Sequence, residues 1–233
     1  MSKISDSQFE SYFVERMREW HDDLPYHNFD GHVMSAIGYF ESIASDLRTK
    51  DVHIDRRLGR LSLFAHDAGY HEDHTAEGYG TKEEYSAAIA EAELNDMGMA
   101  HGEIEIVRGA ILATHFQAAA ETNLEKAVRL ADIGNVSASE TEFLRNMGLL
   151  IQEAAVMKVP LKETFTEHCH ATQSFLNAYL NPAPTFTASD GSEVQLDRHM
   201  SFVNNIKRLG SLPLGTLLRA SENIIIPLPT TWR

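Results

Sequence analysis

His66 and Asp67 are adjacent residues at the end of an apolar stretch, which is expected to form a helix ending near Gly69. Imidazole nitrogen and carboxylate oxygen are common ligands of zinc, manganese and iron. Successive side chains of a regular helix point about 100° apart, so both could turn toward one ion only at the helix end. By itself, such a common dipeptide favours a surface or capping role.

Two other segments contribute side chains of the same kinds. His27 and His32 lie upstream, where a helix over residues 32–48 is expected to begin, and Asp132 lies within an otherwise apolar helix over residues 123–133. Burying an ionised aspartate is costly unless it is paired or binds a metal. Two imidazoles and two carboxylates from three helices would suit Zn²⁺, Mn²⁺, Fe²⁺ or Mg²⁺, with water in the open positions.

This order of His, His-Asp and Asp resembles the HD superfamily of metal-dependent phosphohydrolases. Four short motifs add to the likeness: Tyr26-His27-Asn28, Phe64-Ala65-His66-Asp67-Ala68-Gly69-Tyr70, Glu83-Glu84-Tyr85-Ser86-Ala87 and Ile111-Leu112-Ala113-Thr114. The first resembles the bacterial branch of that family and, more distantly, the cyclic-nucleotide phosphodiesterases. The motifs cover residues 20–135 and are specific only as a set.

The resemblance implies an all-α bundle of the HD type and the hydrolysis of a small phosphoester, such as a nucleotide. The implied ligands of a divalent Mn, Mg, Zn or Fe ion are His32, His66, Asp67 and Asp132. Asp67 could also bridge to a second ion. His27 would act as the general acid that protonates the leaving oxygen, and Glu83 would orient the attacking water or His27.

Three further residues are candidates for substrate binding, namely Asn28, His71 and His115. His71 stands in a polar loop, and a solvated position is the alternative for it. His115 occupies a position where the phosphodiesterases carry an aspartate, so it could be a ligand of a second ion or an ordinary pocket histidine. A second departure from the family is the spacing of five residues from His27 to His32, where four is usual, and Gly31 could absorb the extra residue.

The elements that must position these residues follow from apolar spacing and capping signals. Helices are expected over 5–21, 32–48, a stretch ending near Gly69, 81–97 with a Thr81–Glu84 capping box, 102–119, 123–133, 139–157, 160–180 and 197–208. A small β-hairpin is expected around the Asp190-Gly191 turn. The interpretation is one helical domain over residues 1–208, followed by a C-terminal tail over 209–233 that lies on the surface.

Composition narrows the classes of function. The 233 residues carry a formal net charge of −14, which argues against a nucleic-acid partner. No apolar stretch reaches the length of a membrane span, and the start of the chain has no apolar signal core, so a cytoplasmic protein without a membrane partner is expected. The single cysteine, Cys169, excludes an intrachain disulfide and is expected to pack as a small apolar residue.

Two alternatives to a phosphohydrolase remain open. A di-iron oxygenase of the same fold would need additional histidine ligands, for which the candidates are His71, His74, His101 and His115. A binding module that retains the metal without catalysis would need no further residues. The sequence also leaves the oligomeric state open, with a homo-oligomer as one alternative.

Overall fold

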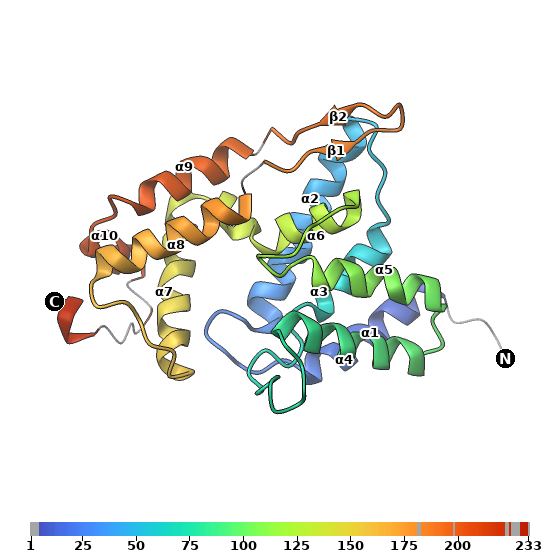
Figure 1. Ribbon diagram of the computed structural model, residues 1–233, viewed down its shortest axis with the longest axis horizontal. Coiled ribbons are helices and arrows are strands. Elements are labelled where there is room, and N and C mark those ends of the chain that lie inside the picture. The colour runs from blue at the N-terminus through green and yellow to red at the C-terminus, as the bar shows by residue number, and fades with distance from the viewer. Residues whose placement is uncertain (1–4, 181–182, 198, 222–223, 225–228, 233) are drawn as a thin grey trace. The chain divides into compact units, whose positions relative to one another are not determined.

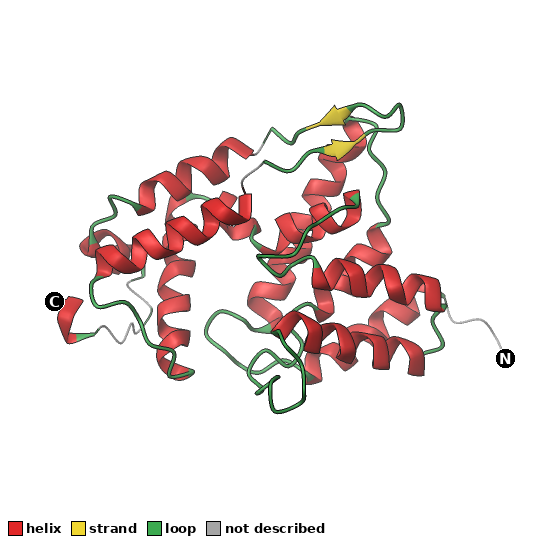
Figure 2. Cartoon of the chain, in the orientation of Figure 1, coloured by secondary structure: helices red, strands yellow, loops and turns green. Residues whose placement is uncertain are grey.

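The computed structural model describes residues 5–180, 183–197, 199–221, 224 and 229–232. Within these residues the regular secondary structure is helical except for a single two-stranded hairpin (Figures 1 and 2), which confirms the expected all-α fold with a small β-hairpin. The α-helices are α1 (Asp6–Glu19), α2 (Met34–Thr49), α3 (Arg56–Ala65), α4 (Lys82–Asp96), α5 (His101–Leu112), α6 (Asn123–Asp132), α7 (Glu140–Val156), α8 (Phe165–Leu180), α9 (His199–Leu209) and α10 (Leu214–Ala220).

The chain divides into two compact units. The first unit contains the residues up to Asp23, His27–Asp132 and Phe186–Val194, and the second contains Leu24–Tyr26, Ile133–Thr185 and the residues from Gln195 onward. Every predicted metal ligand therefore belongs to the first unit. The expected domain boundary at residue 208 stays a prediction, because compact units need not be domains that fold separately.

Helix α3 is the centre of the first unit, where it contacts α1, α2, α4, α5 and α6 (Figure 1). Seven of its ten residues are buried, including Leu61, Leu63 and Phe64. Gly59 lets α2 come close, since a Cβ at that position would lie 2.0 Å from the Phe40 ring. Because the helix is surrounded, the residues that directly follow Ala65 stay inside the unit.

The entry to α2 is a π-helical turn, η1 (Phe29–Val33). The Asn28 side chain caps it by accepting a hydrogen bond of 2.6 Å from the Gly31 N–H, and Val33 N–H bonds to the Asn28 carbonyl at 3.3 Å. A Cβ on Gly31 would lie 2.8 Å from Asn28 Oδ1, so glycine permits the cap. A π turn holds one residue more than an α turn, and this one coincides with the extra residue between His27 and His32.

Helix α5 is shorter than predicted, since it ends at Leu112 instead of continuing to residue 119. The following loop is held by Arg129, whose guanidinium donates to the carbonyls of Ala113, His115, Phe116 and Ala118. These carbonyls accept hydrogen bonds from a side chain that is distant in the sequence. The local apolar pattern therefore could not predict where the helix ends.

Helix α8 begins at Phe165 and not at Pro160 as predicted. This start is set by a capping box that the sequence analysis did not identify. Thr164 Oγ1 accepts a hydrogen bond of 3.2 Å from the Glu167 N–H, and Glu167 Oε2 accepts one of 3.0 Å from the Thr164 N–H. The predicted tail over 209–233 also contains helix α10 and the 3₁₀ turn η3 (Thr230–Trp232). Part of that tail lies outside the described residues.

The hairpin pairs β1 (Phe186–Thr187) with β2 (Glu193–Val194) in antiparallel register and belongs to the first unit. Asn123 at the start of α6 holds it through two hydrogen bonds with the Thr187 backbone, of 2.8 and 2.9 Å. The Asp190-Gly191 turn appears as predicted, with Gly191 at a φ of +84°.

In the second unit, α7 contacts α10 and α8 contacts α9. Cys169 lies buried on α8, and burial raises the pKa of its thiol to about 11. The thiol therefore stays protonated at neutral pH and packs as an apolar group, as expected. Among the helices that the structure describes, none combines the length and the apolar character needed to cross a lipid bilayer.

Candidate metal centre

Four side chains of the first unit bring one donor atom each to a common point. The Nε2 atoms of His32 and His66 lie 3.0 Å apart. Asp67 Oδ2 lies 3.2 Å from both of these nitrogens, and Asp132 Oδ1 lies 3.2 Å from His32 Nε2 and 3.3 Å from His66 Nε2. The four residues that the sequence predicted as ligands are therefore neighbours, although 100 residues separate the first from the last.

These five distances match the spacing of ligand atoms around one ion. If the Nε2 atoms of His32 and His66 and the Oδ1 atom of Asp132 were three corners of a tetrahedron, edges of 3.0–3.3 Å would place its centre about 2.0 Å from each atom, as in zinc sites. If they were adjacent corners of an octahedron, the same edges would give about 2.3 Å, which suits a larger cation. The spacing fits a divalent ion in either geometry.

The backbone around α3 explains why His66 and Asp67 point to the same place. His66 is the C-cap of the central helix, so Asp67 already belongs to the turn that follows. The buried hydroxyl of Ser86 on α4 donates to the Ala68 carbonyl at 2.9 Å and holds that turn. The two side chains therefore converge at the end of the helix, with His66 Nε2 3.2 Å from Asp67 Oδ2, and their role as metal ligands stays a prediction.

The tautomer of His66 is determined by its other ring nitrogen. Nδ1 lies 2.7 Å from the Leu63 carbonyl, and a carbonyl only accepts, so Nδ1 carries the proton. In the neutral ring, Nε2 then presents its lone pair to Asp67 and Asp132. A metal-bound histidine commonly has its second ring nitrogen fixed in this manner.

The electrostatics of the cluster favour an added positive charge. Burial lowers the pKa of His66, but the carboxylates of Asp67 and Asp132 outweigh it and raise that pKa well above its usual value. Burial opposes the charge on Asp67, yet His66 and His32 hold its pKa well below the ordinary range. The same carboxylate field that makes these imidazoles bind protons would attract a metal cation.

Asp67 Oδ2 provides a direct test of whether a cation fits. This oxygen is buried and accepts no hydrogen bond from the described residues, although two imidazole nitrogens lie within ion-pair distance. A buried carboxylate oxygen without a donor is costly. A divalent ion at the common point would satisfy it and would find the nitrogen and oxygen ligands that Zn²⁺, Mn²⁺ and Fe²⁺ accept.

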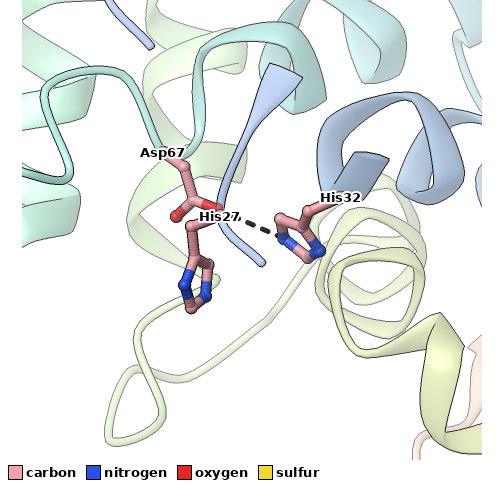
Figure 3. A group of neighbouring side chains, drawn as sticks. All are labelled: His27, His32 and Asp67. Atoms are coloured by element: carbon pink, nitrogen blue, oxygen red, sulfur yellow. Dashed lines mark ion pairs between the residues drawn. The ribbon is translucent and has the colours of Figure 1, made fainter. Parts of the chain in front are cut away.

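His27 lies next to the four-atom cluster without being part of it. Two candidate ligand groups have all their donor atoms within 4.8 Å of one another: His32, His66 and Asp132 form one, and His27, His32 and Asp67 form the other. Figure 3 shows the three side chains together, with the ion pair between His32 and Asp67 as a dashed line. The His27 ring meets the His32 ring edge-on, with centroids 5.2 Å apart. His32 therefore belongs to both candidate groups.

The other predicted site residues are placed as follows. Asn28 caps the π turn beside His27. His71 lies with its Nε2 3.5 Å from Asp22 Oδ2, in the loop after the centre. Glu83 is half-buried in the first turn of α4, and His115 is half-buried beside Phe116. Among the described residues, the last three join neither candidate ligand group. Their roles in binding and catalysis stay predictions.

Sequence reasoning assigned no role to two residues that contact the site. The Tyr70 ring stacks on His27 with centroids 4.0 Å apart, and the Lys82 ammonium lies 3.4 Å from the Tyr70 ring centroid. The only local signal was the position of Tyr70 in the quoted His66-Asp67 motif. No spacing rule indicated that its ring would turn back onto His27.

Comparison with known proteins adds no assignment, because neither a protein-family profile nor a curated protein matches this sequence.

Proposed function

We propose that this chain is a metal-dependent phosphohydrolase that cleaves a small phosphoester, such as a nucleotide or a related monoester or diester. The observation that carries the proposal is the meeting of four donor atoms, two nitrogens and two oxygens, at distances of 3.0–3.3 Å. His32, His66, Asp67 and Asp132 would hold the ion.

A divalent ion in such a site lowers the pKa of a bound water from about 16 toward 7 and withdraws charge from phosphoryl oxygens. The protein residues supply the rest of the chemistry. His66 presents its lone pair because Leu63 fixes its proton on Nδ1. His27, beside the cluster but outside it, would hold a proton on a ring nitrogen and give it to the departing oxygen.

The first experiment is elemental analysis of the purified protein, followed by a screen of phosphomonoesters and phosphodiesters with Mn²⁺, Mg²⁺ and Zn²⁺ supplied separately. We expect close to one bound ion per chain and release of phosphate or of a nucleoside monophosphate. A metal-loaded protein that consumes oxygen with ferrous iron and hydrolyses no ester would contradict the proposal.

His27→Ala separates the proton donor from the ligands. We expect the metal content to stay unchanged, while kcat falls by about 10²–10⁴-fold, because general acid catalysis contributes in that range. Atomic absorption and steady-state kinetics on the same preparation measure the two quantities. Full activity of the variant on an ester with a poor leaving group would show that His27 is not the acid.

A further inference from the structure

The ring of Tyr70 is pressed flat against the imidazole of His27. Their centroids are 4.0 Å apart and their planes differ by 19°. The chain reaches this position by a sharp reversal after the His66-Asp67 pair, where Gly69 has a φ of +70° and its N–H donates to the Trp20 carbonyl at 2.9 Å. The reversal therefore depends on glycine.

The limited space around Gly69 also requires glycine at this position. A Cβ at this position would lie 2.7 Å from the Tyr85 ring. The Tyr85 ring is held in turn, because its hydroxyl donates a short hydrogen bond to Glu72 that raises the pKa of Tyr85 to about 12. The turn that carries Tyr70 is thus built against a fixed ring of α4.

Lys82 holds Tyr70 from a second direction. Its Nζ lies 3.4 Å from the Tyr70 ring centroid and donates to the Tyr70 carbonyl at 3.0 Å. An ammonium and a stacked imidazole cannot occupy one ring face at these distances, so Lys82 and His27 lie on opposite faces of the ring. Lys82 is also the first residue of α4, whose start is set by the Thr81–Glu84 capping box.

His27 itself lies outside the regular helices, just before the π turn that Asn28 caps. A side chain in such a segment has two torsions that can rotate, and a proton donor works only when its ring nitrogen is correctly aimed. The Tyr70 face on one side and the His32 edge on another, 5.2 Å away, limit that rotation.

We propose that Tyr70 and Lys82 are positioning residues, which together hold the His27 imidazole in the orientation needed for proton donation. The inference rests on the proposed function in one respect, namely that His27 is the proton donor. The stacked arrangement can be measured without that assumption.

The arrangement is tested first in metal-free protein by NMR with labelled histidine side chains, where His27→Gln identifies the His27 signals. A stacked phenol ring shifts the His27 ring protons upfield. Tyr70→Leu should remove this shift and Tyr70→Phe should retain it, while Tyr12→Leu, at a 51% exposed position of α1, should leave it unchanged. An unchanged His27 spectrum in Tyr70→Leu would overturn the inference.

The consequence for catalysis is tested with Mn²⁺-loaded protein on p-nitrophenyl phosphate and phenyl phosphate. The first ester has an acidic leaving group that scarcely needs a proton, whereas the second depends on the acid. For Tyr70→Leu we expect kcat on phenyl phosphate to fall about tenfold, with a smaller loss on the nitrophenyl ester and little change in KM. Tyr70→Phe should restore the rate, and metal content should stay constant.

Lys82→Met removes the ammonium at nearly constant length and should produce the same pattern at smaller amplitude. Its control is Lys207→Met, the same change at an exposed position of α9. If His27→Gln shows the leaving-group pattern and Tyr70→Leu does not, the positioning role is wrong while the proposed function stands. If His27→Gln also lacks the pattern, the general acid of the proposed function fails, whatever the NMR result.

Discussion

The first unit contains two buried carboxylate clusters that are built in opposite ways. Glu93 on α4 accepts hydrogen bonds from Arg16 Nε at 2.6 Å and from Trp20 Nε1 at 3.1 Å, and it also pairs with Arg16 Nη2. Asp67 Oδ2, which is also buried, accepts no hydrogen bond from the described residues. Burial alone therefore does not distinguish a structural carboxylate from a ligand.

The two clusters differ in the side chains that pair with their carboxylates. A guanidinium keeps its charge at every physiological pH and donates from fixed positions, so Glu93 is neutralised by the chain itself. The partners of Asp67 and Asp132 are imidazoles, whose charge depends on conditions and whose nitrogens can bind either a proton or a metal. The comparison teaches that one cluster is complete as a pairing of side chains, whereas the other has donor atoms that could hold a cation.

Asp67→Asn should have the largest effect, and it changes only the cluster around His32 and His66, not the Glu93 cluster. The substitution removes the charge of a carboxylate that lies 3.2 Å from the Nε2 atoms of both His32 and His66, so we expect the bound metal to fall from about one ion per chain to a small fraction. Phosphoester hydrolysis should be lost with it. Elemental analysis after dialysis against metal-free buffer measures the first effect.

Glu93→Gln is the matched control, since it makes the same chemical change in the other buried cluster. It should retain its full metal content and its activity. Equal loss of metal in the two variants would mean that binding reports only the integrity of the fold, and the distinction between the clusters would be wrong.

The local elements were predictable because their signals are local. The Thr81–Glu84 box and the Asp190-Gly191 turn both appear where the sequence indicates. The error in the length of α5 arises from a long-range partner. Arg129 donates hydrogen bonds to the carbonyls of the loop that follows α5, where apolar spacing predicted more helix. Helix α10 was missed because the prolines of residues 209–233 suggested a tail lying on the surface.

The candidate site divides in the same way. The proximity of the four candidate ligand residues was predictable because their types carry the chemistry and their order resembles a known arrangement. Tyr70 and Lys82 were not, because their role depends on a reversal at Gly69 that places an ordinary tyrosine on an imidazole 43 residues earlier in the chain. Sequence spacing predicts the face of a helix, but it does not predict such a stack.

Glu93→Ala should destabilise the protein without affecting the metal. It leaves the part-buried Trp20 indole N–H without its Glu93 acceptor, and losing a hydrogen bond to a charged group costs about 1.5–3 kcal/mol. Urea unfolding of the metal-free protein measures this loss. Glu91→Ala on the same helix is the control: its partner Arg108 and Glu91 itself are 44% and 39% exposed, so about 0–1 kcal/mol is expected. Similar losses in the two variants would contradict the assignment of Glu93 as a structural centre.

The smallest expected effect is a fall in the stability of the fold as the pH rises, which we expect only in the metal-free protein. With chelator present, the raised pKa of His66 means that its pairing with Asp67 and Asp132 stabilises the fold fully below pH 6.5 and is lost as the pH rises through the raised value. The lowered pKa of Asp67 implies a contribution that is full above pH 3.8 and is lost as the pH falls from there through the lowered value.

The unfolding temperature of the chelated protein should therefore fall as the pH rises from 6.5 through the raised pKa of His66. His66→Gln should flatten this profile. The Glu93 cluster should contribute nothing to it, because Arg16 remains charged throughout this range. With Mn²⁺ present, the stability should instead rise with pH. Metal binds the deprotonated imidazole, so its affinity increases as the pH rises. A chelated protein whose stability rises over the same range would show that the imidazoles are not held protonated by these carboxylates, and the electrostatic argument for a cation at this point would fail.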